Sequence, residues 1–176
     1  CPMRIFLVGY MGSGKSTFGA ALADALALNW IDLDDEFEAR YKITIIDFFT
    51  KYGETTFREL EHKLLTEISH RNNIVVSTGG GAPCYFDNMK RMNQSGVTVY
   101  LSANAELLIS RIENSARKRP VFQQEKGTNM AENIKRHLET REPFYSQATF
   151  KTDAANPDIE VVKTLILNYY KPIFGV

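Results

Sequence analysis

Cysteine is scarce in this chain, and the residue patterns that build disulfide or metal scaffolds are missing. The 176 residues include two cysteines, Cys1 and Cys84, which form no CxxC pair. The three histidines, His62, His70 and His137, also lack the close spacing of metal ligands. A small domain held together by disulfides or by structural zinc therefore does not fit this sequence.

The chain has no excess of positive over negative residues, and it contains no extended apolar stretch. Lys plus Arg and Asp plus Glu both number 21, so the formal net charge is zero. Proteins that coat nucleic acid or anionic membranes need a cationic excess, so we expect neither partner. The early apolar run at residues 5–8 is far below the roughly 20 residues that span a bilayer, and no secretory-leader pattern precedes it. The expected location is the cytoplasm, and the expected state is a monomer.

What the chain does contain is an alternation of short apolar runs with amphipathic segments of helical length. We expect strands at residues 4–9, 30–34, 74–78, 97–101 and 149–152, and helices at 15–27, 35–41, 45–51, 56–70, 86–93, 105–112, 129–140 and 158–170. No repeat or linker divides the sequence, so residues 1–176 are expected to form a single domain. The alternation predicts an α/β fold whose parallel sheet is covered on both faces. Ligands of such sheets bind at the carboxyl ends of the strands.

A phosphate-binding loop follows the first expected strand. The sequence from Gly9 to Ser16, GYMGSGKS, has two glycines five residues apart followed by Lys and Ser, which is the phosphate-loop pattern. The glycines let backbone N–H groups approach phosphate oxygens closely. Lys15 supplies positive charge to the β- and γ-phosphates, Ser16 can ligate Mg²⁺, and the following helix adds its positive dipole end. A chance glycine-rich turn is the alternative, but the motif lies between an apolar strand and an amphipathic helix. We therefore expect a nucleotide site.

Two aspartates close the second expected strand. Asp32 and Asp34 alternate along its end, so both side chains are expected on one side while Leu33 faces the other. Beside a phosphate loop, one carboxylate can hold Mg²⁺ through water and the other can accept a hydrogen bond from a substrate hydroxyl. The alternative is a pair of surface acids that cap the next helix, because Asp favours helix N-termini.

Three further features are candidates for an acceptor site. Residues 79–81, GGG, follow an apolar strand and leave bare backbone that a ligand can approach closely. Arg58 lies on an expected helix, where pairing with Glu61 or Glu54 on the surface is the simpler interpretation. Arg141 precedes a proline that we expect to end its helix, and a cation near a helix C-terminus is favourable without any ligand.

A basic segment without periodicity follows the helix expected at residues 105–112. Its RKRP sequence, residues 117–120, could pass for a nucleic-acid patch, but the rest of the chain carries no cationic excess. In a phosphate-loop protein such a loop is better interpreted as a lid, here at about residues 112–127. Its arginine would stabilise charge on the transferring phosphoryl group.

These residues together resemble the shikimate kinase family over nearly the whole chain. The shared elements occur in order and at the family's spacing: the run from Gly9 to Gly19, Asp32-Leu33-Asp34, Phe57-Arg58-x-x-Glu61, Gly79-Gly80-Gly81, Arg119-Pro120 and Arg141-x-Pro-x-Tyr145. The resemblance implies a phosphate-loop three-layer sandwich with a five-stranded parallel sheet, a helical substrate-binding region at about residues 33–61 and a mobile lid. It also implies ATP-dependent phosphorylation of shikimate at its 3-hydroxyl, giving shikimate 3-phosphate and ADP, in chorismate and aromatic amino-acid biosynthesis.

The resemblance further implies a role for each matching residue. Lys15, Asp34 and Arg119 are the expected catalytic residues, and Ser16 and Asp32 are expected to hold Mg²⁺. Shikimate is expected to be bound by Asp34, Phe49, Phe57, Arg58, Glu61, Gly79, Gly80, Gly81 and Arg141. ATP, the co-substrate, is expected to be bound by Gly12, Ser13, Gly14, Lys15, Ser16, Thr17, Arg111, Arg119 and Pro157. The third strand ends without an aspartate, so Asp32 would replace the metal-holding acid that is usual there.

Two other functions stay open at this point. A gluconate-type sugar-acid kinase shares the fold and also needs a clamp for an anionic substrate, although the triple glycine and Phe57-Arg58 favour shikimate. Outside enzymes, the alternative is a nucleotide-dependent switch that has lost phosphotransfer. The chain lacks the Asn-Lys-x-Asp motif of GTP switches and keeps each catalytic group that a kinase needs.

Overall fold

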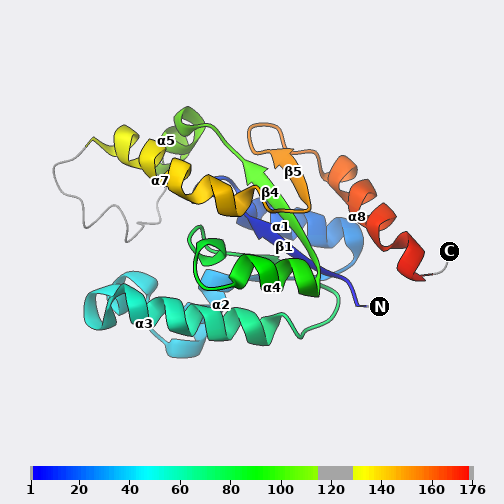
Figure 1. Ribbon diagram of the computed structural model, residues 1–176, viewed down its shortest axis with the longest axis horizontal. Helices are drawn as coiled ribbons and strands as arrows, with labels where there is room; N and C mark the ends of the chain where they lie inside the picture. Colours follow the sequence, from blue (N-terminus) through cyan, green and yellow to red (C-terminus); the bar gives the residue numbers. More distant parts are fainter. Residues whose placement is uncertain (1, 115–128, 175–176) are drawn as a thin grey trace.

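The computed structural model describes residues 2–114 and 129–174, which form one five-stranded sheet between two layers of helices (Figure 1). The strands are β1 (Arg4–Val8), β2 (Asn29–Asp32), β3 (Ile74–Ser77), β4 (Val97–Ser102) and β5 (Phe150–Asp153). They lie in the order β2-β3-β1-β4-β5, and each neighbouring pair is parallel. The α/β fold with a five-stranded parallel sheet, predicted from the sequence, is confirmed.

The two helical layers pack on two separate apolar cores. The helices are α1 (Lys15–Leu26), α2 (Leu33–Tyr41), α3 (Ile45–Ile68), the short 3-10 helix η1 (Ala82–Cys84), α4 (Asn88–Ser95), α5 (Ala105–Glu113), α7 (Met130–Tyr145) and α8 (Ile159–Phe174). Within β1, Ile5 and Leu7 face the layer of α1 and α8, whereas Phe6 and Val8 face α2, α3, α4 and α7. Because side chains alternate along a strand, this one buried strand contributes to both cores.

The strand order determines where a ligand can bind. β1 and β3 are hydrogen-bonded neighbours, but the chain leaves them toward opposite faces, to α1 after β1 and to α4 after β3. A crevice opens at the carboxyl ends of such a pair, and open α/β sheets bind ligands there. The loops at residues 9–14 and 78–81 border this crevice.

β2 is shorter than the sequence pattern predicts. The prediction that Asp32 and Asp34 alternate along one strand is therefore wrong. The strand ends at Asp32, whose side chain caps α2 by accepting hydrogen bonds from the backbone N–H groups of Asp34 (3.0 Å) and Asp35 (3.1 Å). Asp34 therefore lies in the first turn of a helix and not on a strand. The capping alternative is correct for Asp32, although this residue also faces the phosphate loop.

Two helices also differ from expectation. α3 joins two expected helices, and Gly53, with φ of 83° and ψ of 170°, kinks it between them. α7 continues through Pro143 to Tyr145, so the prediction that this proline ends the helix is wrong. The proline removes one backbone donor close to the helix end, and the fully buried Tyr145 holds the last turn in the core. Within the described ranges, no helix combines the length and the apolar character that a membrane crossing requires.

Candidate active site

A cavity of about 520 Å³ lies around the loop that joins β1 to α1. Each predicted nucleotide-binding residue in the described ranges lines it, as do both predicted metal ligands. The lining residues are Met11, Gly12, Ser13, Gly14, Lys15, Ser16, Thr17, Phe18, Ala21, Asp32, Asp34, Thr78, Gly79, Gly80, Arg111, Ala154, Pro157 and Ile159. Residues 115–127 of the predicted lid, which include Arg119, lie outside the described residues.

Glycine is required at two positions of the loop. Gly14, with φ of 95°, is in the left-handed region directly before α1, and a β-carbon on Gly9 would lie 2.8 Å from a backbone oxygen of β4. Lys15 is buried, and its Nζ donates hydrogen bonds to the carbonyl oxygens of Gly9 (2.6 Å) and Tyr10 (3.0 Å). The ammonium group is therefore held against the loop at the first turn of α1, whose dipole adds positive potential there.

Ser16 and Asp32 meet beside this loop. Ser16 Oγ donates a hydrogen bond to Asp32 Oδ2, while Asp32 Oδ1 is held by the cap of α2. β3 supplies no acid at this point, because it ends at Ser77, whose Oγ donates to the Lys15 carbonyl oxygen (2.7 Å) and accepts from Trp30 Nε1 (3.0 Å). In the described part of the chain, no group of three or more His, Cys, Asp or Glu side chains could hold a metal by itself. A cation bound here would share its ligands with phosphate oxygens or water.

A second cavity, of about 60 Å³, adjoins the first. Its lining contains every residue predicted to bind the acceptor. The lining residues are Met11, Asp34, Ile45, Phe49, Phe57, Arg58, Glu61, Gly79, Gly80, Gly81 and Arg141. Met11, Asp34, Gly79 and Gly80 line both cavities. The two cavities therefore share a wall, and among the described residues the Asp34 carboxylate is the only charged side chain in that wall.

Arg58 is a buried cation in the smaller cavity. Its Nη1 donates to Glu61 Oε1 (2.8 Å), and its Nε lies 3.5 Å from Glu54 Oε1. The Tyr85 ring stacks on the guanidinium at 4.3 Å from its centre to Cζ. The simpler interpretation of the sequence was that Arg58 pairs with these two glutamates on the surface. The predicted partners are correct, but the predicted surface location is wrong, because Arg58 is only 7% exposed. Its Nε is buried and makes no hydrogen bond within the described residues.

Burial controls the charge of Glu61. Desolvation raises the pKa of its carboxyl to about 7, further than the Arg58 guanidinium lowers it, and the Asp34 carboxylate adds to the rise. Desolvation also acts to lower the pKa of Arg58, but attraction to Glu61 and the hydrogen bond with it outweigh this and raise that pKa. Near neutral pH the pocket therefore holds a firmly charged arginine beside a glutamate whose protonated and ionised forms are both populated.

A second guanidinium reaches the same cavity from α7. Arg141 Nη1 is buried and finds no hydrogen-bond partner among the described residues. Its Cζ lies 5.4 Å from the centre of the Tyr10 ring. One helical turn later, the Tyr145 hydroxyl donates to the Gly80 carbonyl oxygen (2.5 Å) and so holds the glycine segment against α7. Two arginines from different helices thus present buried N–H groups to one cavity, an arrangement that suits a planar carboxylate.

Arg111 joins the phosphate loop to the segment after β5. Its Nη1 donates to the Ser13 carbonyl oxygen (2.9 Å) and its Nη2 to the Ala154 carbonyl oxygen (3.0 Å). Pro157 lies in the same segment and also lines the larger cavity, together with Ile159. Arg111 and Pro157 were predicted from the sequence, but the neighbouring Ala154 and Ile159 were not, because they belong to no motif.

Other residues of the acceptor cavity were also missed. Met11 and Ile45 line it, and Tyr85 covers Arg58 from outside. No spacing in the sequence indicates these contacts, because each depends on how distant elements pack. Tyr145 did carry a signal, as the last residue of the Arg141-x-Pro-x-Tyr145 motif.

Fold and site together define a class of protein. Nucleotide-dependent switches and motors transfer the phosphoryl group to water and need no pocket for an organic acceptor, whereas a small-molecule kinase needs a second pocket that opens onto the phosphates and holds the acceptor. The smaller cavity, with its two arginines and the carboxylate in the shared wall, has this form. The chain is accordingly a phosphate-loop kinase of a small anionic molecule.

Comparison with known proteins narrows this class. The family model for shikimate kinase matches residues 11–169. A shikimate kinase of Bacteroides fragilis is 46% identical over 148 residues, which are 84% of this chain and 83% of that protein. The chain belongs to the shikimate kinase family, and the resemblance seen in the sequence is confirmed.

Solved structures give the same result. The crystal structure of shikimate kinase from Bacteroides thetaiotaomicron matches with a TM-score of 0.86 and 39% identity, over 97% of this chain and 99% of that one. Shikimate kinase from Acinetobacter baumannii in complex with shikimate matches with a TM-score of 0.79 and 31% identity, over 97% and 93%. A gluconokinase from Sinorhizobium meliloti, with a TM-score of 0.54 and 20% identity over 97% of both chains, shares the fold alone.

Proposed function

We propose that the protein transfers the γ-phosphoryl group of ATP to the 3-hydroxyl of shikimate, giving shikimate 3-phosphate and ADP, in chorismate and aromatic amino-acid biosynthesis. The shared wall between the two cavities is the observation that carries this proposal. One cavity surrounds the phosphate loop, the other contains Arg58 and Arg141, and Asp34 lines both. A phosphoryl group that leaves the first cavity reaches an acceptor in the second beside this carboxylate.

The acceptor cavity suits the chemistry of shikimate, which has one carboxylate and three hydroxyls. Arg58 and Arg141 clamp the carboxylate, because their buried N–H groups need an acceptor and a guanidinium can donate two parallel hydrogen bonds. Asp34 accepts a hydrogen bond from the reacting hydroxyl and takes its proton during the attack. Phe49 and Phe57 pack against the ring, and the bare backbone of residues 79–81 lets it approach closely.

The nucleotide cavity suits ATP with Mg²⁺. Ser16 and Asp32 offer the oxygen ligands that Mg²⁺ prefers, with the remaining positions taken by phosphate oxygens and water. When bound, the metal neutralises charge on the phosphates. Lys15 stabilises the negative charge that develops on the transferring group. Arg111 and Pro157 bracket the adenine.

Several finer points remain predictions from the sequence. Arg119 is expected to meet the ATP phosphates from a lid at about residues 112–127. Residues 1–176 are expected to form one domain whose substrate-binding region covers about residues 33–61. The cytoplasmic location and the monomeric state also rest on the sequence analysis.

A coupled ADP-release assay tests the proposed function. We expect rapid ADP release with shikimate, only slow background release with gluconate or with no acceptor, and a single phosphorylated product substituted at the 3-hydroxyl by ³¹P NMR. Faster ADP release with gluconate than with shikimate would favour the sugar-acid alternative and overturn the proposal.

A further inference from the structure

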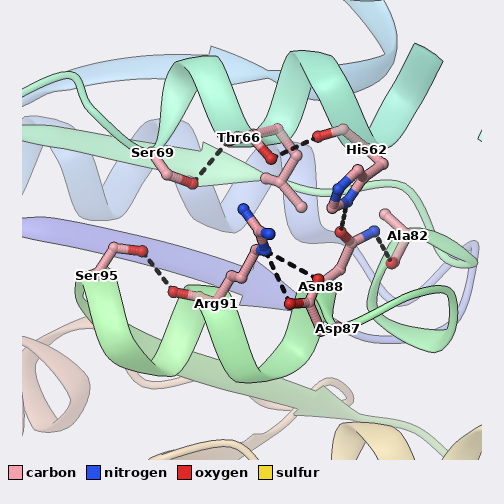
Figure 2. A network of polar contacts seen from close by, with 9 residues as sticks. His62, Thr66, Ser69, Ala82, Asp87, Asn88, Arg91 and Ser95 are labelled. Atoms are coloured by element: carbon pink, nitrogen blue, oxygen red, sulfur yellow. Dashed lines mark hydrogen bonds and ion pairs between the residues drawn. The ribbon is translucent and has the colours of Figure 1, made fainter. Parts of the chain in front are cut away.

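A polar network behind the acceptor cavity joins two of the elements that form its walls (Figure 2). Asn88, the first residue of α4, is 1% exposed. Its Nδ2 donates a hydrogen bond to the Ala82 carbonyl oxygen (2.9 Å), and its Oδ1 lies 2.5 Å from His62 Nδ1. Figure 2 shows the Asn88 amide between the imidazole on α3 and the turn that contains Ala82. One buried side chain therefore connects α3 to the segment after β3.

The hydrogen-bonding capacity of these groups fixes the direction of the network. A backbone carbonyl can only accept, so the amide nitrogen of Asn88 faces Ala82 and the amide oxygen faces His62. His62 must then carry a proton on Nδ1, which it donates. The Phe86 ring lies against the imidazole, with 4.9 Å between the ring centres. The result is a chain of two hydrogen bonds with one direction: His62 donates to Asn88, and Asn88 donates to the Ala82 carbonyl oxygen.

Both ends of this chain adjoin residues of the acceptor cavity. His62 follows Glu61 on the helix that also carries Arg58, and Ala82 follows Gly81 directly. The contact between these two elements inside the cavity is tight, because a β-carbon on Gly81 would lie 2.4 Å from Arg58 Nη2. A shift of α3 relative to the glycine segment would therefore displace the guanidinium.

We propose that Asn88 is a positioning residue for acceptor binding, which locks α3 to the glycine segment and so sets the place of the Arg58 guanidinium. It acts through these elements and not by contact, since it lines neither cavity of the active site. It lines instead a separate groove of about 220 Å³ between α3 and α4, together with Arg91 and Ser95. The inference deepens the proposed function and rests on it.

The first test removes both hydrogen bonds of Asn88 while keeping the number and branching of its side-chain heavy atoms. For Asn88→Leu we expect the KM for shikimate to rise about tenfold, the effect of misplacing one charged donor, while the KM for ATP changes less than about twofold. Arg91→Gln is the matched control, because Arg91 lines the same groove and its ion pair with Asp87 is exposed. It should leave both KM values and kcat unchanged.

His62 provides a second test from a less buried position, which decides the question if Asn88→Leu does not fold. His62→Ala should raise the KM for shikimate about threefold, the effect of one net hydrogen bond, and His62→Asn, whose amide can donate from the place of Nδ1, should restore it. A purely structural role would lower the melting temperature without changing the ratio of the two KM values. That outcome would overturn the inference, whereas a wild-type protein that does not phosphorylate shikimate would overturn the proposed function instead.

Discussion

The two cavities of the active site are built in different ways. The nucleotide cavity takes its largest single contribution from one continuous stretch, residues 11–18, whose backbone and first helical turn surround the phosphate position. The acceptor cavity takes its lining from separate parts of the chain: one side chain each from α2 and α7, several from α3, and the bare glycine backbone after β3. Asp34 and Arg141, at the two ends of this set, come together only through the fold. The first cavity is therefore a property of local sequence, and the second is a property of tertiary packing.

This difference predicts that the two cavities can be damaged separately. Substitutions in the loop should change the nucleotide and the chemical step, and substitutions in the surrounding helices should change acceptor binding. The variants below test this separation.

The largest effect is expected for Lys15→Ala. The change removes the positive charge held against the phosphate loop, so kcat should fall about 10²–10³-fold or more, as for the loss of one preorganised donor to a transition-state charge. Affinity for shikimate should stay close to wild type. A rate assay and calorimetry on the same sample make the measurement, with Lys171→Ala, exposed on α8, as the control. A near-wild-type rate would contradict the loop assignment.

Arg58→Ala and Arg141→Ala should give the next largest effect, on the other cavity. Loss of one charged hydrogen-bonded contact costs about 1.5–3 kcal/mol, which corresponds to roughly ten- to hundredfold weaker shikimate binding. ADP binding should not change. Arg40→Ala is a suitable control, because the ion pair of Arg40 with Glu67 lies at the surface. If ADP affinity fell and shikimate affinity did not, the carboxylate clamp would be wrong.

Gly81→Ala should disturb the acceptor cavity through a steric clash with Arg58 and without backbone strain. Its φ of −88° is open to any residue, but the new methyl group would lie 2.4 Å from Arg58 Nη2 and displace it. We expect about tenfold weaker shikimate binding, within the range for a lost charged contact. Gly53→Ala is the converse case, because Gly53 has a positive φ and no neighbour within 4 Å. That variant should lose about 1–3 kcal/mol of stability, because a positive φ with a ψ of 170° is essentially restricted to glycine, and it should keep its shikimate affinity. Equal binding losses in both variants would point to a general loosening of α3.

The same contrast explains how much the sequence could predict. The phosphate loop and the parallel sheet follow from contiguous patterns, so both were accessible without a structure. The burial of Arg58 was not, because glutamates three and four residues away are typical of an exposed helix, and the ring of Tyr85 that covers it comes from another segment. Asp34 was wrongly placed on a strand. The same Asp-x-Asp spacing fits both the end of a strand and the cap and first turn of a helix, so the sequence pattern could not distinguish the two. The acceptor residues were assembled at the sequence level by family resemblance and not by spacing.

Glu61 should affect the pH dependence of stability. Its pKa is raised from an ordinary value of 4.5 to about 7, so the folded protein binds this proton more tightly than the unfolded chain does. Stability should therefore fall as the pH rises from about 4.5 to about 7, by roughly 3 kcal/mol from this one group. Chemical denaturation of wild type and Glu61→Gln across this range isolates the contribution. The difference between their unfolding free energies should shrink toward lower pH, and a constant difference would contradict the raised pKa.

The shared wall at Asp34 is the centre of the account, and single-turnover kinetics of Asp34→Asn test it most directly. The amide keeps the shape of the side chain but cannot take the proton of the acceptor hydroxyl. With calorimetry showing both shikimate and ADP still bound within about tenfold of wild-type affinity, the rate of phosphoryl transfer should fall about 10²–10⁴-fold, the usual contribution of a positioned base. Transfer at the wild-type rate in a variant that binds both ligands would contradict the assignment of Asp34 as the residue at which the two cavities act together.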